Sequence, residues 1–251
     1  MDRITAHQIA GMIDHAILTP NSRLDDVEAA SRLCARYQTA SICVRPSDVP
    51  VAAAILRDSP VKVCTVLGFP HGTTSTAAKV AEAEQAWKDG CQEIDMVLNI
   101  GRLLSGDHEY VEHDIAAVTA VARRTGMLIK VIFETFYLDS AQKIAACSIC
   151  SRVGVDFVKT STGFAGGGAT VDDIHLMRSN CPAHVGIKAS GGVRDLDAAL
   201  AVIACGATRI GTSSTEKIVQ EARTREANGE LRPMVLEDAL ARGEQGKTKI
   251  Y

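Results

Sequence analysis

The sequence predicts a TIM (β/α)8 barrel that forms a single domain, and three observations lead to this fold class. Eight short apolar segments rich in Val and Ile alternate with segments of helical periodicity. Their apolar runs are nearly continuous, as in parallel strands that helices cover. With 251 residues and 46% hydrophobic residues, the chain can bury the core of one barrel. We therefore expect one domain over residues 1–251, without a linker.

Each predicted strand is an apolar run bounded by Gly, Pro or polar clusters, and each predicted helix carries apolar residues at helical spacing. In the first unit, Pro20 ends the strand, while Asp25 and Asp26 suit the first turn of the helix that follows. The predicted strands are Ile13–Leu18, Ser41–Arg45, Val61–Leu67, Glu93–Ile100, Leu128–Glu134, Asp156–Ser161, Val185–Ser190 and Thr208–Thr212. The predicted helices are Leu24–Tyr37, Ser47–Arg57, Thr74–Asp89, His108–Arg124, Ser140–Val153, Val171–Ser179, Leu196–Ala204 and one that begins at Ser213.

The two ends of the chain extend this pattern. A short amphipathic helix over Ile4–Ile13, with Thr5 as a suitable N-cap, precedes the barrel. A polar, glycine-containing tail over about residues 243–251 follows the last helix and is expected to be mobile. An open, doubly wound sheet is the competing architecture. The segment Ile17-Leu-Thr-Pro20 stands where that fold has its glycine-rich fingerprint, so the barrel is favoured.

The composition excludes several classes of function. A net charge of −3 with both signs dispersed offers no basic stripe for nucleic acid and no polybasic patch for a membrane. No apolar run approaches the roughly 18 residues that span a bilayer, and the first ten residues lack the apolar core of a signal peptide. We expect a cytoplasmic protein whose eight cysteines are reduced. The oligomeric state stays open, and a homodimer or homotetramer is compatible with the sequence.

Two lysines near the ends of successive buried strands indicate where the chemistry lies. Lys159 ends an apolar run before the glycine-rich segment Gly163–Gly168, and Lys188 holds an equivalent place in the next strand. A buried ammonium is costly, and each of two neighbouring cations disfavours the charged form of the other, which produces a nucleophilic amine. The alternative is a pair of structural lysines in salt bridges.

A buried carboxylate accompanies these lysines. Asp95 lies in an otherwise apolar strand, so it needs a cation, which Lys159 or Lys188 can supply. The site works only if Asp95 holds Lys188, rather than Lys159, as the cation. A purely structural ion pair is the alternative. Lys130 is a second candidate nucleophile, although it shares a strand face with Glu134 and the two can neutralise each other. No cluster of residues at the strand ends is typical of a metal site.

The loops after the last two strands favour a phosphate site. In eight-stranded barrels, functional residues lie at the carboxyl ends of strands, and phosphate commonly binds after strands seven and eight. The glycines there let backbone N–H groups approach an anion, and the second loop opens onto a helix N-terminus. The alternative is that these glycines only relieve crowding. The candidate phosphate segments are Ser190-Gly191-Gly192 and Gly211-Thr212-Ser213-Ser214. The same rule places Asp14, a candidate substrate-binding residue, and Cys43 at the mouth of the barrel.

Four segments give the chain a family resemblance. It resembles the deoxyribose-phosphate aldolases, class I aldolases that use a lysine Schiff base, from about Ile13 to Ser214. The segments are Phe157-Val-Lys-Thr-Ser-Thr-Gly-Phe164, Gly186-Ile-Lys-Ala-Ser-Gly-Gly192, Glu93-Ile-Asp-Met-Val-Leu-Asn-Ile-Gly101 and Leu67-Gly-Phe-Pro-His-Gly72.

The resemblance implies a TIM barrel that cleaves 2-deoxy-D-ribose 5-phosphate reversibly to D-glyceraldehyde 3-phosphate and acetaldehyde. It implies no metal and no cofactor, and its partners are small sugar phosphates and aldehydes. By the same resemblance Lys159 forms the Schiff base, and Asp95 and Lys188 relay protons. The phosphate residues that it implies are Gly191, Gly192, Gly211, Ser213 and Ser214.

Two departures from the family pattern bear on substrate preference. Ala16 stands where the family usually has a threonine, and Phe164 stands where some members have a lysine. Two residues are candidates for accessory roles. Cys43 can react with unsaturated aldehydes unless it is buried and inert. Tyr251 can fold over the mouth and assist proton transfer unless the tail is simply disordered.

Two other functions remain compatible with these residues. One is a transaldolase-like or other Schiff-base aldolase that acts on a different sugar phosphate. The other is a barrel without catalysis that binds a sugar phosphate as a sensor. Reduction of a Schiff base by borohydride separates the sensor from both enzymes, and the choice of acceptor separates the two enzymes.

Overall fold

Eight parallel strands close into one barrel in the computed structural model, which describes residues 3–244. Strands that follow one another in sequence pair side by side, and β8 pairs with β1 to close the ring, with His15 opposite Thr212. The predicted fold class is therefore confirmed. The strands are β1 (Ile13–Ile17), β2 (Ser41–Val44), β3 (Lys62–Leu67), β4 (Glu93–Val97), β5 (Leu128–Ile132), β6 (Phe157–Lys159), β7 (Gly186–Ser190) and β8 (Arg209–Thr212).

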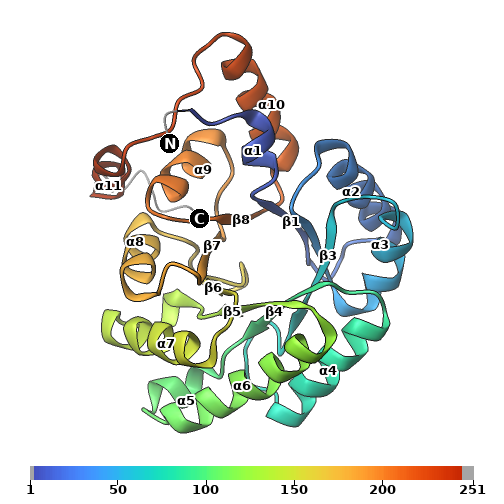
Figure 1. Cartoon of the computed structure of the whole chain (residues 1–251), viewed down its shortest axis with the longest axis vertical. Coiled ribbons are helices and arrows are strands. Elements are labelled where there is room, and N and C mark those ends of the chain that lie inside the picture. The colour runs from blue at the N-terminus through green and yellow to red at the C-terminus, as the bar shows by residue number, and fades with distance from the viewer. Residues whose placement is uncertain (1–2, 245–251) are drawn as a thin grey trace.

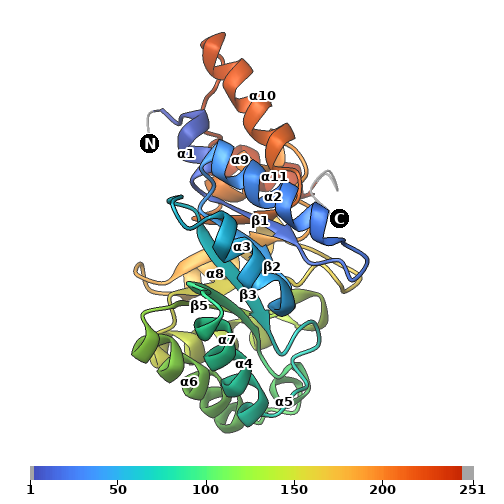
Figure 2. The same ribbon diagram turned by 90° about the vertical axis from the view of Figure 1, so that its right-hand side faces the viewer.

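Helices surround the strands as an outer ring (Figure 1). Every predicted helix is present, with boundaries shifted by a few residues. The helices are α1 (Ala6–Ala10), α2 (Leu24–Tyr37), α3 (Val49–Ile55), α4 (Thr76–Lys88), α5 (Ile100–Leu104), α6 (His108–Thr125), α7 (Ser140–Val153), α8 (Val171–Asn180), α9 (Leu196–Ala204), α10 (Thr215–Ala227) and α11 (Leu236–Glu244). Thr5 caps α1 as expected, because its side chain accepts a hydrogen bond from the Gln8 amide. Helices α1 and α10 lie side by side at one end of the molecule (Figure 2).

Two helices were not expected from the sequence. The strand predicted to reach Ile100 ends at Val97, and Asn99 caps α5 by accepting a hydrogen bond from the Arg102 amide at 3.1 Å. Helix α11 follows α10 after a short connection and reaches Glu244, two residues into the predicted tail. Short 3₁₀ turns, η1 (Pro46–Asp48) and η2 (Thr135–Tyr137), follow β2 and β5. The rest of the tail, including Tyr251, lies outside the described residues.

Side chains along each strand alternate between the helix layer and the barrel interior, because the strand period is two residues. The outward set is apolar and fully buried against the helices. It includes Ile42, Ile94, Val131, Ile187 and Ile210. On several of the same strands, the inward-facing side chains are instead charged. These charged side chains form the site described below. Within residues 3–244, no helix is long and apolar enough to cross a membrane.

Candidate active site

The barrel interior holds one connected network of ion pairs. Its members come from six strands and converge on the barrel axis, although TIM barrels usually fill this space with branched apolar residues. The members are Asp14 of β1, Glu93 and Asp95 of β4, Lys130 of β5, Lys159 of β6, Lys188 of β7 and Arg209 of β8. Buried charges are tolerated only when they are paired, so the network must be satisfied as a unit.

Asp95 lies at the centre of this network and is fully buried. Its Oδ1 accepts a hydrogen bond from Lys130 Nζ at 2.9 Å. Its Oδ2 accepts from Lys159 Nζ at 2.8 Å and from Lys188 Nζ at 2.7 Å. Burial alone would raise the pKa of Asp95, but the three ammonium groups outweigh burial and hold this pKa well below its usual range. Asp95 is therefore a carboxylate at neutral pH.

Strand register explains why these groups meet. Asp95 is directly opposite Lys130 in the β4–β5 pair, and Lys159 is directly opposite Lys188 in the β6–β7 pair. Residues opposite each other in a parallel pair point to the same face of the sheet. The two predicted lysines are thus neighbours.

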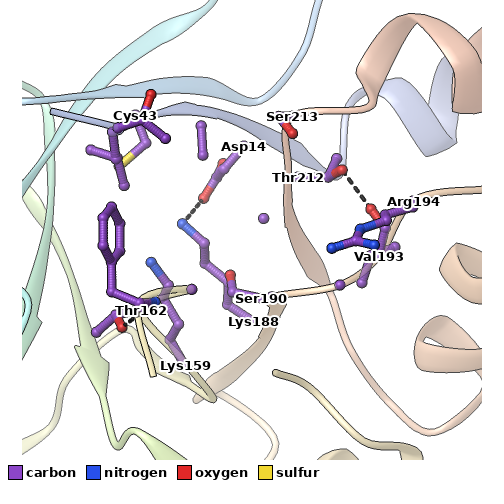
Figure 3. A pocket seen from close by; sticks show the side chains of 18 residues that line it. Asp14, Cys43, Lys159, Thr162, Lys188, Ser190, Val193, Arg194, Thr212 and Ser213 are labelled. Atoms are coloured by element: carbon purple, nitrogen blue, oxygen red, sulfur yellow. Dashed lines mark hydrogen bonds and ion pairs between the residues drawn. The ribbon is translucent and has the colours of Figure 1, made fainter. Parts of the chain in front are cut away.

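Asp14 distinguishes Lys188 from Lys159. Asp95 is nearer to Lys188 than to Lys159, as expected, but by only 0.1 Å, so this distance alone does not separate the two lysines. Lys188, however, has a second carboxylate partner, because its Nζ lies 2.6 Å from Asp14 Oδ2 (Figure 3). Burial would lower the pKa of Lys188, but Asp14 and Asp95 raise it above its usual value. Lys188 is therefore held as the cation by two carboxylates together.

Lys130 lies deeper in the barrel than the other two lysines and does not line the pocket described below. It does not pair with Glu134, so that expectation was wrong: its Nζ lies 2.7 Å from Glu93, 2.9 Å from Asp95 and 3.5 Å from Asp14. Burial opposes its charge, but these carboxylates raise its pKa well above the usual value. Lys130 is a poor nucleophile in this position.

Lys159 has the fewest carboxylate partners among the cations of the network. The network contains four cations and three carboxylates, so one positive charge is in excess. Lys159 pairs with Asp95 alone, whereas Lys188, Lys130 and Arg209 each pair with two or more carboxylates. Lys159 also lines the pocket, so its amine is the one placed for Schiff-base chemistry.

A cavity of about 280 Å³ opens above the network at the carboxyl ends of the strands. Figure 3 shows Lys159 and Lys188 projecting toward this space from below, with Cys43 and Asp14 on the facing wall. Most residues predicted from sequence line this pocket. They are Asp14, Cys43, Lys159, Lys188, Gly191, Gly192, Gly211 and Ser213. Asp95 lies beneath the floor, and Ser214 lies just behind the wall, where its amide donates to Thr212 Oγ1 at 2.9 Å.

The end of the pocket formed after β7 and β8 has the shape expected of an anion site. Gly191 and Gly192 have φ angles of +86° and +85°, which side-chain-bearing residues rarely adopt. A Cβ at Gly211 would collide with the Ser190 hydroxyl. These glycines line the pocket and also relieve crowding, and the second loop leads into the N-terminus of α10.

Arg194 is a pocket residue that sequence reasoning missed. Its exposed side chain stands at the rim beside Thr212 and Val193 (Figure 3). A guanidinium there can form charge-assisted hydrogen bonds with a phosphate. The available signal was its position, two residues after the Gly191-Gly192 pair. Thr162, Thr212, Leu18 and Thr19 also line the pocket.

The two departures from the family pattern both reach this cavity. Ala16 and Phe164 are lining residues. Phe164 is 44% exposed and packs edge-on against Phe69, with ring centroids 5.2 Å apart. The mouth is therefore apolar at the position where a lysine would add a cation.

Cys43, Cys64 and Asp95 bring two thiols and a carboxylate within 4.8 Å of one another, which are ligand types that metals accept. The same carboxylate already accepts hydrogen bonds from three ammonium groups, and Lys130 Nζ lies 3.4 Å from Cys64 Sγ. A divalent cation would be repelled by these charges. The donor set therefore does not fit a metal.

A (β/α)8 barrel with a pocket-facing lysine beside a buried carboxylate and a second lysine is the arrangement of a class I aldolase. The family model described as DeoC/LacD family aldolase matches residues 8–221. The chain therefore belongs to this family.

Named relatives agree with this membership. A deoxyribose-phosphate aldolase 1 of Bacillus licheniformis is 51% identical over 85% of this chain and 95% of its own length. A deoxyribose-phosphate aldolase of Rhodopirellula baltica is 47% identical over 86% of this chain and 90% of its own. The solved structure of a tetrameric deoxyribose phosphate aldolase of Aeropyrum pernix is 29% identical, with a TM-score of 0.81 over 86% of this chain and 92% of that one.

Proposed function

We propose that this chain catalyses the reversible aldol cleavage of 2-deoxy-D-ribose 5-phosphate to D-glyceraldehyde 3-phosphate and acetaldehyde. The observation that carries this proposal is the position of Lys159, which faces the pocket, while the remaining cations of the network are held by two or more carboxylates. The similarity to relatives named deoxyribose-phosphate aldolase supports the choice of substrate.

Lys159 starts the reaction as a neutral amine. It attacks the aldehyde carbon of the open-chain sugar, and the resulting carbinolamine loses water to form an iminium. The bond between the second and third carbons then breaks as the hydroxyl on the third carbon loses its proton. The bonding electrons move into the iminium and form an enamine, and the aldehyde of glyceraldehyde 3-phosphate leaves. Protonation of the enamine and addition of water release acetaldehyde and regenerate Lys159.

Lys188 and Asp95 are the proposed proton relay for these steps. Lys188 carries a proton between two carboxylates and projects into the same pocket as Lys159. A group that gives and regains a proton beside the reacting carbon accelerates the carbinolamine and enamine steps. Asp14 assists by holding Lys188 in place.

The loops after β7 and β8 are the proposed phosphate site. Gly191, Gly192, Gly211 and Ser213 line that end of the pocket, Ser214 is the N-cap residue of α10, and Arg194 supplies a cation at the rim. A phosphate there and an aldehyde at Lys159 would be the two ends of one substrate. Neither a metal nor a cofactor is needed for this chemistry.

We also propose a compartment and an oligomeric state for this enzyme. All eight cysteines are free thiols, which suits a reducing compartment, so we place the reaction in the cytoplasm. Residues 1–251 are proposed to act as one aldolase domain without nucleic-acid partners. A homodimer or homotetramer is proposed because a similar protein is described as tetrameric, and light scattering on the purified chain tests this.

Borohydride trapping tests the proposed function. Sodium borohydride with acetaldehyde should inactivate the protein and leave an ethyl group on Lys159, located by peptide mass spectrometry. Lys159→Met should lose both the adduct and cleavage of deoxyribose 5-phosphate, by about 10,000-fold or more. The matched variant Lys130→Met should still be trapped.

Three other outcomes would change the assignment. An adduct on Lys130 would contradict the choice of nucleophile. An adduct on Lys159 without cleavage of deoxyribose 5-phosphate would indicate an aldolase for another sugar phosphate. The absence of any adduct would indicate a barrel that binds without catalysis.

A further inference from the structure

Glu134 is a buried carboxylate that the proposed mechanism does not use. It follows β5, is 1% exposed, and has φ +56° and ψ +66°, a left-handed conformation that is uncommon for a residue with a side chain. Among the described residues, the other non-glycine residue with positive φ is Gln38, which ends α2 in the usual left-handed C-cap position. Glu134 has no such helix to end. Strained backbone of this kind often accompanies functional sites.

The left-handed turn directs the Glu134 side chain onto the loop that follows Lys159. Oε2 of Glu134 accepts a hydrogen bond from the Thr162 amide at 3.1 Å and a second from the Thr162 hydroxyl. The backbone on either side is joined to the same loop, since the Phe133 amide donates to the Lys159 carbonyl at 2.9 Å and the Thr135 amide to the Thr160 carbonyl at 3.0 Å. Burial raises the pKa of Glu134 despite the hydrogen bonds from Thr162.

Thr162 lines the pocket three residues after Lys159, and its hydroxyl has a fixed hydrogen-bonding direction. Its single hydrogen is donated to Glu134, and one lone pair accepts from the Phe164 amide at 3.0 Å. A hydroxyl has one hydrogen and two lone pairs, so one lone pair remains for the pocket. Toward a substrate, Thr162 can therefore only accept a hydrogen bond.

We propose that Glu134 is a positioning residue for specificity: by holding the Thr162 hydrogen, it makes Thr162 an acceptor that selects substrates carrying a hydroxyl next to the reacting carbonyl. This inference rests on the proposed aldolase function and adds to it a reason for choosing the acceptor aldehyde. A site built to accept a hydrogen bond discriminates against a ligand that lacks the donor, because the remaining lone pair of Thr162 is then buried without a partner.

Two acceptor aldehydes test this role in the synthetic direction, with acetaldehyde as donor. D-Glyceraldehyde 3-phosphate carries the hydroxyl, and 3-oxopropyl phosphate has the same length and phosphate without it. Glu134→Gly removes the carboxylate while suiting the positive φ. We expect its kcat/KM to fall about 10-fold to 100-fold for glyceraldehyde 3-phosphate and less than about threefold for the other aldehyde. Glu134→Gln should keep the preference, because its amide oxygen can accept both hydrogen bonds.

Gln38→Gly is the matched control, since it relieves the same backbone conformation far from the site, and it should leave both values unchanged. Equal losses for both aldehydes in Glu134→Gly would indicate a structural role and overturn the proposal, as would an unchanged preference. Loss of the preference in Glu134→Gln would also overturn it. Borohydride trapping on Lys159 confirms that each variant retains its nucleophile. A parent protein that neither traps acetaldehyde nor cleaves deoxyribose 5-phosphate would instead refute the proposed function.

Discussion

The two faces of the barrel sheet have opposite chemistry, although the same strands supply both. On β7, Ile187 points outward into the apolar helix layer, while its neighbour Lys188 points inward to Asp14 and Asp95. The outer layer gains stability from the removal of apolar area from water. The inner network has to offset the cost of burying charges, and replacing such networks by apolar groups is often neutral or stabilising. The outward-facing side chains therefore contribute most of the stability, and the inward-facing side chains form the candidate site.

Substitution of the inward-facing Lys188 should reduce activity. Lys188→Arg keeps a cation near Asp14 and Asp95 but cannot release a proton near neutral pH. We expect turnover of deoxyribose 5-phosphate to fall about 100-fold to 10,000-fold, while borohydride still traps Lys159. Steady-state kinetics with quantitative trapping measure both. Parent-like turnover in Lys188→Arg would assign Lys188 a structural role.

Substitution of the outward-facing Ile187 should reduce stability. Ile187→Ala removes a fully buried side chain, so we expect the free energy of unfolding to fall by about 2–5 kcal/mol. Activity per folded molecule should stay within about threefold, because the inward neighbour Lys188 is unchanged. Urea unfolding and kinetics at 25 °C provide the two values. If Ile187→Ala instead lost much of its activity while its free energy of unfolding stayed unchanged, the outward-facing side chain would affect the inward-facing site.

His15 gives the outer layer a dependence on pH. Its ring lies between β1 and α10, with Nδ1 2.8 Å from Thr215 Oγ1, and burial lowers its pKa from 6.5 to about 4. Between these values the unfolded chain binds a proton that the folded protein does not, so stability falls as the pH falls. The loss attributable to His15 should reach about 2 kcal/mol at about pH 5. Urea unfolding of parent and His15→Gln across this range isolates the effect, and identical pH profiles would refute it.

Substitution of the inward-facing Cys43 should have a smaller effect, on the rate of inactivation by acetaldehyde. It lines the same pocket as Lys159, and a hydrogen bond with Cys64 lowers the pKa of its thiol despite burial. Unsaturated aldehydes formed when acetaldehyde condenses with itself should add to this thiol. Cys43→Ala should slow inactivation by concentrated acetaldehyde by about threefold or more. Cys91→Ala, whose thiol pKa burial raises to about 12, is the control. Equal inactivation rates in all three proteins would leave Cys43 inert.

The order of the barrel could be predicted because local patterns determine it. Apolar runs ended by residues such as Pro20 and Gly68 mark each strand end, and parallel pairing of successive strands follows from the intervening helices. Helix α5 was missed because Leu98 and Ile100 extend the apolar run of β4 beyond the sheet. Leu98 is fully buried although it lies outside any strand. The sequence alone does not distinguish an apolar residue buried in a strand from one buried in the segment that follows.

The candidate site could be predicted only in part. Lys159, Lys188 and Asp95 were found because charges are conspicuous in apolar strands. The pairing of Asp14 with Lys188 joins residues 174 positions apart and depends on how the barrel closes. Glu93 and Arg209 were missed because both stand at strand beginnings, where a charge is typical of a solvated end. Their inward direction follows from strand register, which sequence patterns do not specify.

The contact of Asp95 with three lysines also bears on how the chain selects its correct strand alignment. A shift of β5, β6 or β7 by one residue would turn its lysine outward into the layer of isoleucines and valines. An ammonium there would lack the carboxylate it finds at Asp95 and would incur the full cost of desolvation. Misaligned closures of the sheet are thus penalised by the same charges that are proposed to perform catalysis. The buried charges therefore favour the native strand alignment over its neighbours.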